Sequence, residues 1–224
     1  MCEPGKLFVF EGPDNSGKTT LSIASAEYFR SKGIECDYFA FPGREIGTLG
    51  TLVYGLHHDP QSRGVQAITP TSLQLLHIAA HVDAIESKIL PALKIGRNVV
   101  LDRFWWSTLV YGRVAGANRA ALGRMVDLEQ ACWANHSPEG VFLIQRSNPI
   151  TAPATDDWKA VSQEYAEVAA QEANRYPVWY VENNGGFADA LSQVVKHIYL
   201  DRELSEADGS TTADRYYHPA STEA

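Results

Sequence analysis

LFVFEGPDNSGKTT, residues 7–20, joins a short apolar run to a glycine-rich loop that ends in a lysine and two threonines. Gly12 to Thr19 fit the pattern G-x-x-x-x-G-K-[ST], with a predicted strand before it and a predicted helix after it. In that setting the backbone N–H groups of the loop and of the helix start point into one concavity that holds phosphate oxygens. The alternative, a chance glycine-rich turn, does not account for this context. The segment therefore predicts binding of a nucleoside triphosphate.

The same loop supplies the side chains expected to contact the triphosphate. Lys18 is expected to reach the β- and γ-phosphates, and Thr19 is expected to ligate Mg²⁺. Arg146, much later in the chain, is a candidate to stack on adenine or to contact phosphate. The predicted nucleotide-contacting residues are Gly12, Asn15, Ser16, Gly17, Lys18, Thr19, Thr20 and Arg146.

Strand and helix patterns alternate along the rest of the chain. This alternation predicts crossover units and a parallel sheet that is covered on both faces. We therefore predict an α/β three-layer sandwich of the P-loop NTPase type with a five-stranded parallel sheet over residues 1–200, followed by a polar, flexible tail over residues 201–224. The predicted strands cover 6–11, 35–41, 98–101, 140–145 and 177–182, and the predicted helices cover 18–32, 70–93, most of 105–135, 158–174 and 187–200.

The composition is that of a globular protein with an acidic balance. Of 224 residues, 45% are hydrophobic, and 19 basic against 27 acidic side chains give a formal charge of −8. This balance argues against broad electrostatic binding to nucleic acid, although a local basic groove is compatible with it. Cys2, Cys36 and Cys132 have no paired spacing, and neither a signal peptide nor a membrane-spanning run is visible. We therefore expect free thiols and a cytoplasmic location.

Two arginines follow predicted strands in positions that suit a second anion. Arg44 follows the second strand, and the pair Asp102-Arg103 ends the third. The carboxyl ends of parallel strands meet at one crevice, so Arg44 and Arg103 are expected to converge opposite the phosphate loop. Arginine suits this task because its planar fork binds phosphate bidentately. Asp102 is expected to join the Mg²⁺ shell or to orient the acceptor. The alternative for Asp102-Arg103 is a local ion pair.

At these residues the chain resembles the thymidylate kinase family. The matching stretches are FEGPDNSGKTT, FPGREIG and DRFWWSTLVYG, which lie in the family's order over roughly residues 5–200. The resemblance implies an ATP- and Mg²⁺-dependent kinase that phosphorylates dTMP or a modified pyrimidine deoxynucleoside monophosphate. It also implies a homodimer formed through helices near residues 50–90 and 105–135.

The resemblance assigns roles to individual side chains. Asp14 resembles the loop acid near the acceptor's sugar hydroxyl, Arg44 and Arg103 resemble the clamps on the acceptor phosphate, and Tyr111 resembles the ring that disfavours a 2′-hydroxyl. Lys18, Arg44, Asp102 and Arg103 are the expected catalytic residues, with Thr19 and Asp102 as metal ligands. The expected acceptor-binding residues are Asp14, Phe41, Arg44, His77, His81, Arg103, Ser107 and Tyr111.

The base pocket departs from the family pattern at three positions. His77 occupies the place of an aromatic residue that stacks on thymine, and His81 occupies the place of an arginine that hydrogen-bonds the edge of the base. Gly112 replaces the glutamine or threonine that usually follows the tyrosine. The two histidines share a helix face, so a metal site and ordinary pocket histidines are the alternatives to a base contact. The accepted base therefore need not be plain thymine.

The lid segment after the fourth predicted strand, residues 145–157, is short and rich in proline. It holds Arg146 as its one arginine, and the phosphate loop has Asn15 where one class of the family has an arginine. A missing transition-state arginine is costly, because such residues contribute on the order of a thousandfold or more in rate. Either Arg146 or Lys159 substitutes, a partner supplies an arginine, or the enzyme is slow.

A short lid also leaves room for a bulky acceptor. The first alternative function is a kinase that phosphorylates a 5-hydroxymethyl pyrimidine within DNA, with Trp105 and Trp106 as stacking platforms for an extruded base. Ordinary packing of these two indoles is the competing interpretation. The second alternative is a non-catalytic nucleotide-binding module, which the short lid favours and the complete set of charged motif residues disfavours.

Replacing Lys18 with alanine is expected to abolish phosphoryl transfer, because the loop would lose its charge on the β- and γ-phosphates. The measurement is transfer of label from γ-labelled ATP to a deoxynucleotide acceptor. If the variant kept the wild-type rate, Lys18 would take no part in phosphoryl transfer.

Overall fold

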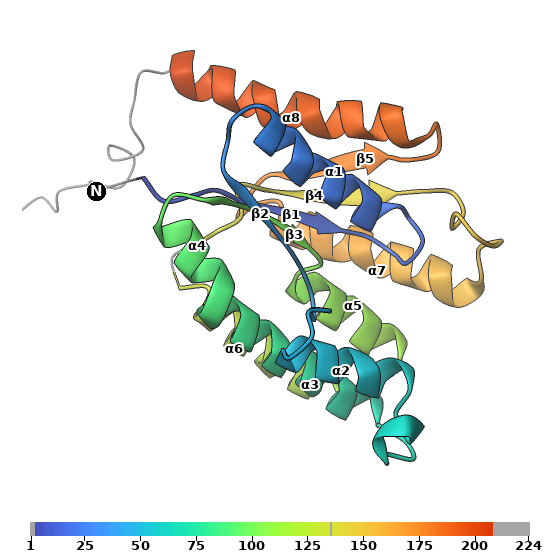
Figure 1. Cartoon of the computed structure of the whole chain (residues 1–224). Helices are drawn as coiled ribbons and strands as arrows, with labels where there is room; N and C mark the ends of the chain where they lie inside the picture. The colour runs from blue at the N-terminus through green and yellow to red at the C-terminus, as the bar shows by residue number, and fades with distance from the viewer. Residues whose placement is uncertain (1–2, 135, 208–224) are drawn as a thin grey trace, which may run out of the picture.

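A computed structural model describes residues 3–134 and 136–207 of the chain. At its centre lies a five-stranded sheet in the order β2-β3-β1-β4-β5, in which every neighbouring pair is parallel (Figure 1). The predicted α/β fold class is thus confirmed. The strands are β1 (Leu7–Glu11), β2 (Cys36–Ala40), β3 (Asn98–Asp102), β4 (Gly140–Gln145) and β5 (Val178–Glu182).

Helices cover both faces of this sheet. One face carries α1 and α8, and the other carries the remaining larger helices, with α6 packed on α3 and α5 (Figure 1). The helices are α1 (Lys18–Ser31), α2 (Leu49–His58), α3 (Pro70–Ala84), α4 (Leu90–Lys94), α5 (Trp105–Val114), α6 (Arg119–Cys132), α7 (Asp156–Glu172) and α8 (Phe187–Ala207).

Apart from polar residues at their ends, the central strands are apolar because both of their faces are buried. Successive side chains of a strand point to opposite faces, and β1 shows the consequence. Leu7 and Val9 join the core formed with the segment Ile85–Ile89, α4, α5 and α7, whereas Phe8 and Phe10 join the core under α1 and α8. The alternation fixes the register of β1, because a slip by one residue would exchange the two sets.

The helix predicted over residues 70–93 is continuous but changes its winding. After α3, the segment Ile85–Ile89 forms a π-helix, and α4 then completes the run. Pro91 explains the change, because it has no N–H group and its ring would clash with the carbonyl four residues earlier in an α-helix. The wider turn moves that carbonyl away while the helix continues.

Residues 105–135 are mostly helical, as predicted, and two further segments differ from the prediction. The region 105–135 contains two helices, with Gly116 at φ 77° between them and Asn118 capping α6 through its contact with the Ala121 N–H at 3.0 Å. Helix α2 lies in the region near residue 50 where the family resemblance implied helices, but its bounds and the short 3₁₀ turn Gln61–Arg63 were not predicted. Helix α8 continues to Ala207, past the predicted end at residue 200, and the rest of the predicted tail lies outside the described residues. No helix in the described ranges is both long and apolar enough to cross a membrane.

The proposed stacking role of Trp105 and Trp106 is wrong. Both indoles lie in the core, with 4% and 0% of their surface exposed, so neither offers a face to an extruded base. The Trp106 indole N–H donates to the Tyr176 hydroxyl at 3.0 Å, which satisfies its polar atom inside the core. Ordinary packing, the competing interpretation, therefore describes this pair.

Replacing Trp106 with alanine should lower the free energy of unfolding by about 3–5 kcal/mol, because it opens a cavity that the core cannot refill. Urea unfolding followed by circular dichroism measures this. The matched control is Phe187→Ala, since Phe187 is 47% exposed and its removal should cost less than about 1 kcal/mol. Equal losses for the two variants would contradict the assignment of Trp106 to the core.

Candidate functional site

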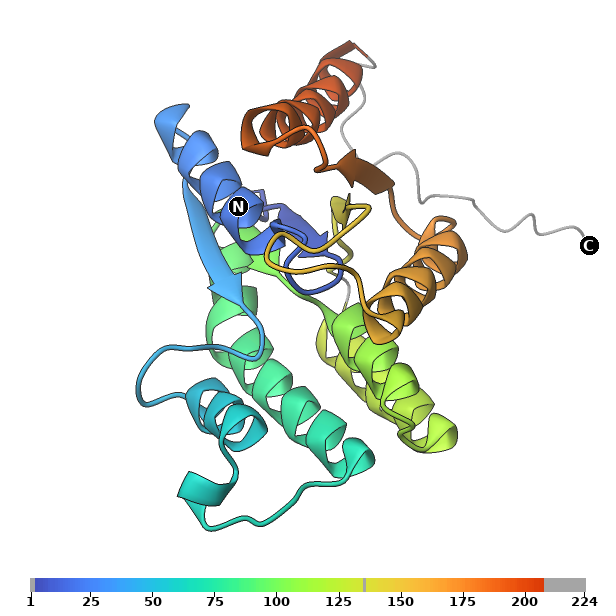
Figure 2. The same ribbon diagram turned by 90° about the vertical axis from the view of Figure 1, so that its right-hand side faces the viewer.

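The candidate site lies at the carboxyl ends of the strands, where the loops after β1, β2, β3 and β4 come together (Figure 2). Lys18, Arg44 and Arg103 all line one cavity of about 650 Å³ there. The structure therefore brings the cation of the phosphate loop and both arginines to the same crevice. Ten of the residues predicted from the sequence line this cavity: Asp14, Asn15, Gly17, Lys18, Thr19, Thr20, Phe41, Arg44, Asp102 and Arg103.

The phosphate loop has backbone geometry that restricts its sequence. Gly12 and Gly17 have φ of 142° and 92°, and Asn15 has φ of 59°, a conformation that asparagine tolerates better than most residues. A Cβ atom at Gly17 would lie 2.4 Å from the side-chain nitrogen of Asn183. That nitrogen donates to the Ser16 carbonyl at 2.7 Å, so the loop after β5 supports the phosphate loop from behind.

Lys18 lies buried at the floor of the cavity. Its ammonium group contacts the Pro13 carbonyl at 3.4 Å and an Asp14 oxygen at 3.5 Å. Burial, together with the nearby charge of Arg103, lowers the pKa of Lys18 to about 8. A buried cation with such weak contacts is suited to an anionic ligand that completes its hydrogen bonds.

The residues beside Lys18 fit a divalent cation. The Thr19 hydroxyl donates to Oδ2 of Asp102 at 2.5 Å, which places the two predicted metal ligands side by side. The other carboxylate oxygen of Asp102 is buried and has no hydrogen-bond partner among the described residues. A hydroxyl and a free carboxylate oxygen are hard oxygen donors of the kind that Mg²⁺ prefers.

Arg103 is held in an unusual backbone conformation, with φ of 75°. Its guanidinium donates to the Ser107 hydroxyl at 3.0 Å, forms an ion pair with Asp14, and lies 5.3 Å from the centre of the Tyr111 ring. The Asp14 N–H donates to the Tyr111 hydroxyl at 3.0 Å. The loop acid, the arginine and the tyrosine thus form one connected group, and strain of this kind is typical of functional sites.

Glu11 organises this group and was missed by the sequence analysis. Its buried carboxylate accepts hydrogen bonds from the N–H groups of Phe104 and Ser107 at 2.7 and 3.0 Å, and from the hydroxyls of Ser107 and Tyr165 at 2.8 and 3.0 Å. Burial raises the pKa of Glu11. The carboxylate caps the start of α5, whose own N-cap residue offers no side-chain bond. An acidic residue at the end of an otherwise apolar strand is the signal that could have indicated this role.

A second cavity of about 470 Å³ adjoins the first and shares Asp14, Phe41, Arg44 and Arg103 with it. The other residues that were predicted to bind the acceptor also line this second cavity. They are His77, His81, Ser107 and Tyr111.

His77 and His81 play different parts in this second cavity. Nε2 of His77 lies 3.2 Å from Nδ1 of His57, a residue of α2 that the prediction did not include. His81 is buried, stacks on Phe41 with ring centres 4.0 Å apart, and contacts Glu129 through Nδ1 at 2.9 Å. Among the described residues, no group of three or more metal-type side chains is arranged to hold a metal ion.

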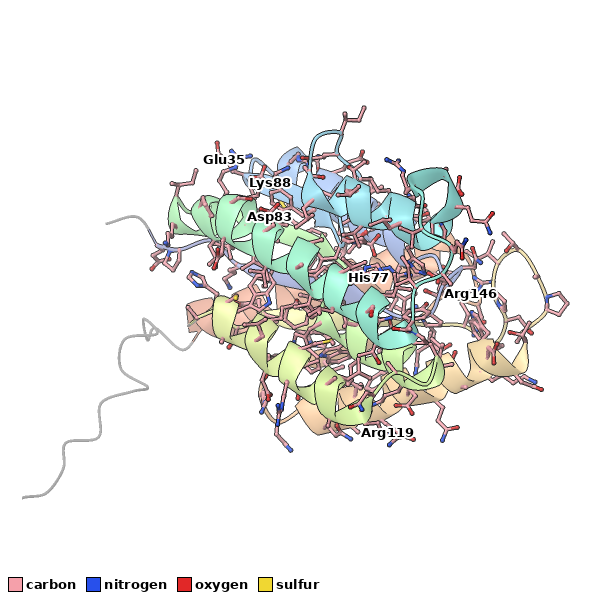
Figure 3. All side chains as sticks on the ribbon, turned by 90° about the horizontal axis from the view of Figure 1, so that it is seen from below. Glu35, His77, Asp83, Lys88, Arg119 and Arg146 are labelled. Carbon is pink, nitrogen blue, oxygen red and sulfur yellow. The ribbon has the colours of Figure 1, made fainter. Side chains whose placement is uncertain are left out.

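The lid segment packs on the phosphate loop without bringing a cation to it. The Ile150 N–H donates to the Asn15 carbonyl at 2.9 Å, and the Trp158 indole donates to the Asp14 carbonyl at 2.8 Å. Arg146 lies on this segment, away from the helix that bears His77 (Figure 3), and its guanidinium binds the backbone carbonyls of Asn148 and Asn183. Lys159 is exposed and pairs with Asp156. Neither Arg146 nor Lys159 lines either of the two cavities described.

Comparison with known sequences identifies a family whose members resemble this chain. The model of the family described as "Thymidylate kinase" matches residues 10–175. A thymidylate kinase of Protochlamydia amoebophila is 41% identical over 230 residues, which cover 92% of this chain and 97% of that protein. A thymidylate kinase of Dinoroseobacter shibae is 35% identical over 144 residues, and one of Chlamydia trachomatis is 40% identical over 110 residues. In these two comparisons the chain spans 66% and 51% of the relative's length.

A solved structure supports the fold. The crystal structure of thymidylate kinase from Ehrlichia chaffeensis superposes with a TM-score of 0.69 at 24% identity, covering 88% of this chain and 99% of that chain.

Replacing His77 with phenylalanine should make folding less sensitive to acid. Burial, with His81 and His57 nearby, lowers the pKa of His77 to about 3. Between about pH 6.5 and that value the unfolded histidine takes up a proton that the folded one does not, so the folded state loses stability as the pH falls. Phenylalanine binds no proton, so at this position it makes no contribution to the pH dependence of stability.

Urea unfolding of both proteins at about pH 8 and pH 5 measures this effect. The free energy of unfolding of the variant, relative to wild type, should rise by up to about 2 kcal/mol on going to the lower pH. A constant difference at the two pH values would show that folded His77 is protonated as readily as an unfolded histidine.

Proposed function

The chain belongs to the thymidylate kinase family, and we propose that it transfers the γ-phosphoryl group of ATP to a pyrimidine deoxynucleoside monophosphate. The proposed acceptor is dTMP or a close analogue with a modified base, and the proposed metal is Mg²⁺. The observation that carries the proposal is the pair of adjoining cavities, which share Asp14, Arg44 and Arg103.

The shared residues suggest how two phosphorylated molecules meet. Lys18 and the loop N–H groups would hold the triphosphate in the larger cavity, and the smaller cavity would hold the sugar and base of the acceptor. Arg44 and Arg103 lie where the two cavities join, so they would hold the acceptor phosphate beside the γ-phosphate. Phosphoryl transfer needs little covalent chemistry from a protein, and holding the two phosphates in line is most of the task.

Charge neutralisation is the other part of the task. The attacking phosphate oxygen and the transferred group both carry negative charge, and Lys18, Arg44 and Arg103 reduce their repulsion. Thr19 and Asp102 would hold Mg²⁺, which would neutralise negative charge on the triphosphate. Ile150 of the lid and Trp158 in the first turn of α7 bind the backbone of the phosphate loop and would limit the access of water to the triphosphate.

We also propose that a second copy of the chain covers the outer side of α3 and α6. These helices pack together, and each exposes a leucine on its surface, Leu75 at 51% and Leu128 at 52%. Light scattering after size exclusion tests this, and a monomer at micromolar concentration would contradict it.

The activity is tested with γ-labelled ATP and Mg²⁺, offered with dTMP, dUMP, dCMP, dGMP and duplex DNA with or without 5-hydroxymethyl pyrimidines. We expect label on dTMP or on another pyrimidine deoxynucleotide. Label retained only on DNA would replace this proposal with the DNA-directed alternative. ATP binding without transfer to any acceptor would indicate a non-catalytic module.

Replacing Asp102 with asparagine should raise the Mg²⁺ concentration needed for half-maximal rate by roughly ten- to a hundredfold. The asparagine oxygen can still accept the hydrogen bond from the Thr19 hydroxyl, so the substitution removes the negative charge while the side chain keeps nearly the same shape. The control is Lys94→Ala, because Lys94 is an exposed residue of α4 outside both cavities and should leave the rate unchanged. If the Asp102 variant needed no more Mg²⁺ than wild type, the carboxylate of Asp102 would not be a metal ligand.

A further inference from the structure

The lid segment and the start of α7 bind two consecutive carbonyl groups of the phosphate loop. The Trp158 indole N–H donates to the Asp14 carbonyl at 2.8 Å. The Ile150 N–H donates to the Asn15 carbonyl at 2.9 Å. The lid and the phosphate loop therefore lie side by side (Figure 2). Asp14 and Asn15 are themselves exposed, so these bonds act on a part of the loop that the core does not hold.

Two helices that pack together hold the backbone of Asp14. Its N–H donates to the Tyr111 hydroxyl of α5 at 3.0 Å, and its carbonyl accepts from Trp158 of α7. The two helices are in contact, and an ion pair of 3.0 Å between Arg113 and Glu164 joins them. The contacts at Asp14 therefore come from one connected support.

The indole of Trp158 is itself fixed in position by its helix. Thr155 caps α7 by accepting a hydrogen bond from the Trp158 N–H at 3.1 Å. Tyr165 lies about two turns further along the same face of α7. Its hydroxyl contacts Glu11 at 3.0 Å and Ser107 at 2.8 Å. A shift of α7 would break these buried contacts, so the indole N–H is a rigid donor.

The peptide between Asp14 and Asn15 has one group on each side. It is a trans peptide, so its C=O and N–H groups point in opposite directions. Because Trp158 binds the carbonyl, the Asn15 N–H points away from the indole. No hydrogen bond to this N–H is formed within the described ranges. Asn15 lines the larger cavity together with Lys18, so the N–H is available to a phosphate oxygen there.

The backbone at Asn15 favours the opposite orientation of this peptide. Its φ of 59° is a left-handed value that costs conformational energy in any residue with a side chain. A half-turn of the peptide would change this φ to about −120°, which most residues prefer. The same half-turn would direct the Asp14 carbonyl oxygen to the place of the N–H, where it would repel a phosphate. Bonds from outside the loop must therefore hold the binding orientation.

We propose that Trp158 is a positioning residue that holds the Asp14–Asn15 peptide with its N–H group toward the triphosphate. A half-turn of the peptide breaks the indole bond, because the carbonyl then faces away from the ring. This inference rests on the proposed function and deepens it, since it assigns the orientation of one phosphate-binding N–H to a residue 144 positions further along the chain.

The test compares the Kd for ATP with Mg²⁺ in wild type and in Trp158→Phe, measured by titration calorimetry without an acceptor. Phenylalanine keeps an aromatic ring on α7 but has no N–H, so the bond to the Asp14 carbonyl is lost. We expect Kd to rise by about tenfold, the usual effect of one hydrogen bond to a charged group. An unchanged Kd would overturn the proposal.

Two controls separate positioning from a general loosening of the site. Ser162→Ala removes a hydroxyl that donates to the Trp158 carbonyl at 2.9 Å, and Ser162 lies outside both cavities, so the Kd for ATP should stay the same. Adenosine has no phosphate, so its affinity, measured by NMR titration, should be equal in wild type and in Trp158→Phe. An equal loss of ATP affinity in the Ser162 variant, or an equal loss of adenosine affinity in the Trp158 variant, would overturn the proposal.

NMR of the indole N–H groups provides a readout that needs no activity. The chain has five tryptophans, and the signal that Trp158→Phe lacks identifies Trp158. In wild type this proton should exchange with water more slowly than that of a free indole, and exchange at the free rate would overturn the proposal.

The outcomes also distinguish this inference from the proposed function. Absence of transfer to every nucleotide, with weaker ATP binding in Trp158→Phe, would refute the proposed function and leave the positioning role standing. Transfer to dTMP, with equal ATP binding by both proteins, would do the reverse. Failure of the wild-type protein to bind ATP would overturn both.

Discussion

The carboxylate of Glu11 is the contact on which the site depends. It ends the central strand β1 and binds the first N–H groups of α5, so the sheet and the helix meet at a fixed angle. Arg103 lies in the short link between β3 and α5, and its backbone N–H donates to the Phe10 carbonyl at 2.9 Å. With both ends of the link held in this way, the positive φ of Arg103 is imposed by its surroundings. Gly12 follows Glu11 directly, so the same residue joins the two halves of the site.

The cavities also show how an acidic protein can bring two anionic molecules together. The formal charge of the chain is −8, yet the cations Lys18, Arg44 and Arg103 gather at the crevice. Their effect is strongest there because burial lowers the local dielectric constant, whereas charges on the outer surface are screened by salt. Net charge therefore says little about what the crevice binds, and the placement of a few cations decides it.

The sequence alone was sufficient to predict the parts of the candidate site that lie at the ends of strands. The phosphate loop, Arg44 and Asp102-Arg103 each follow an apolar strand, and parallel strands bring such positions together whatever the rest of the chain does. Contacts between helices could not be predicted in this way. Glu129 reaches His81 because α6 packs on α3, and no local pattern in either helix indicates that packing.

The exposure of Trp105 and Trp106 likewise depends on neighbours from distant segments, which is why their predicted role was wrong. The lid is a further case. The sequence shows that Arg146 is present, but its binding to the carbonyls of Asn148 and Asn183 depends on how the loop after β5 lies.

Gly112 lies where α5 packs against both α3 and α6, and this limits which residues the position can hold. A larger residue at 112 would collide with Leu122 and with the chain of Gln74, so the two positions cannot vary independently. A side chain at position 112 would therefore need a smaller or displaced residue at 122 before any change at Gln74 could accommodate it.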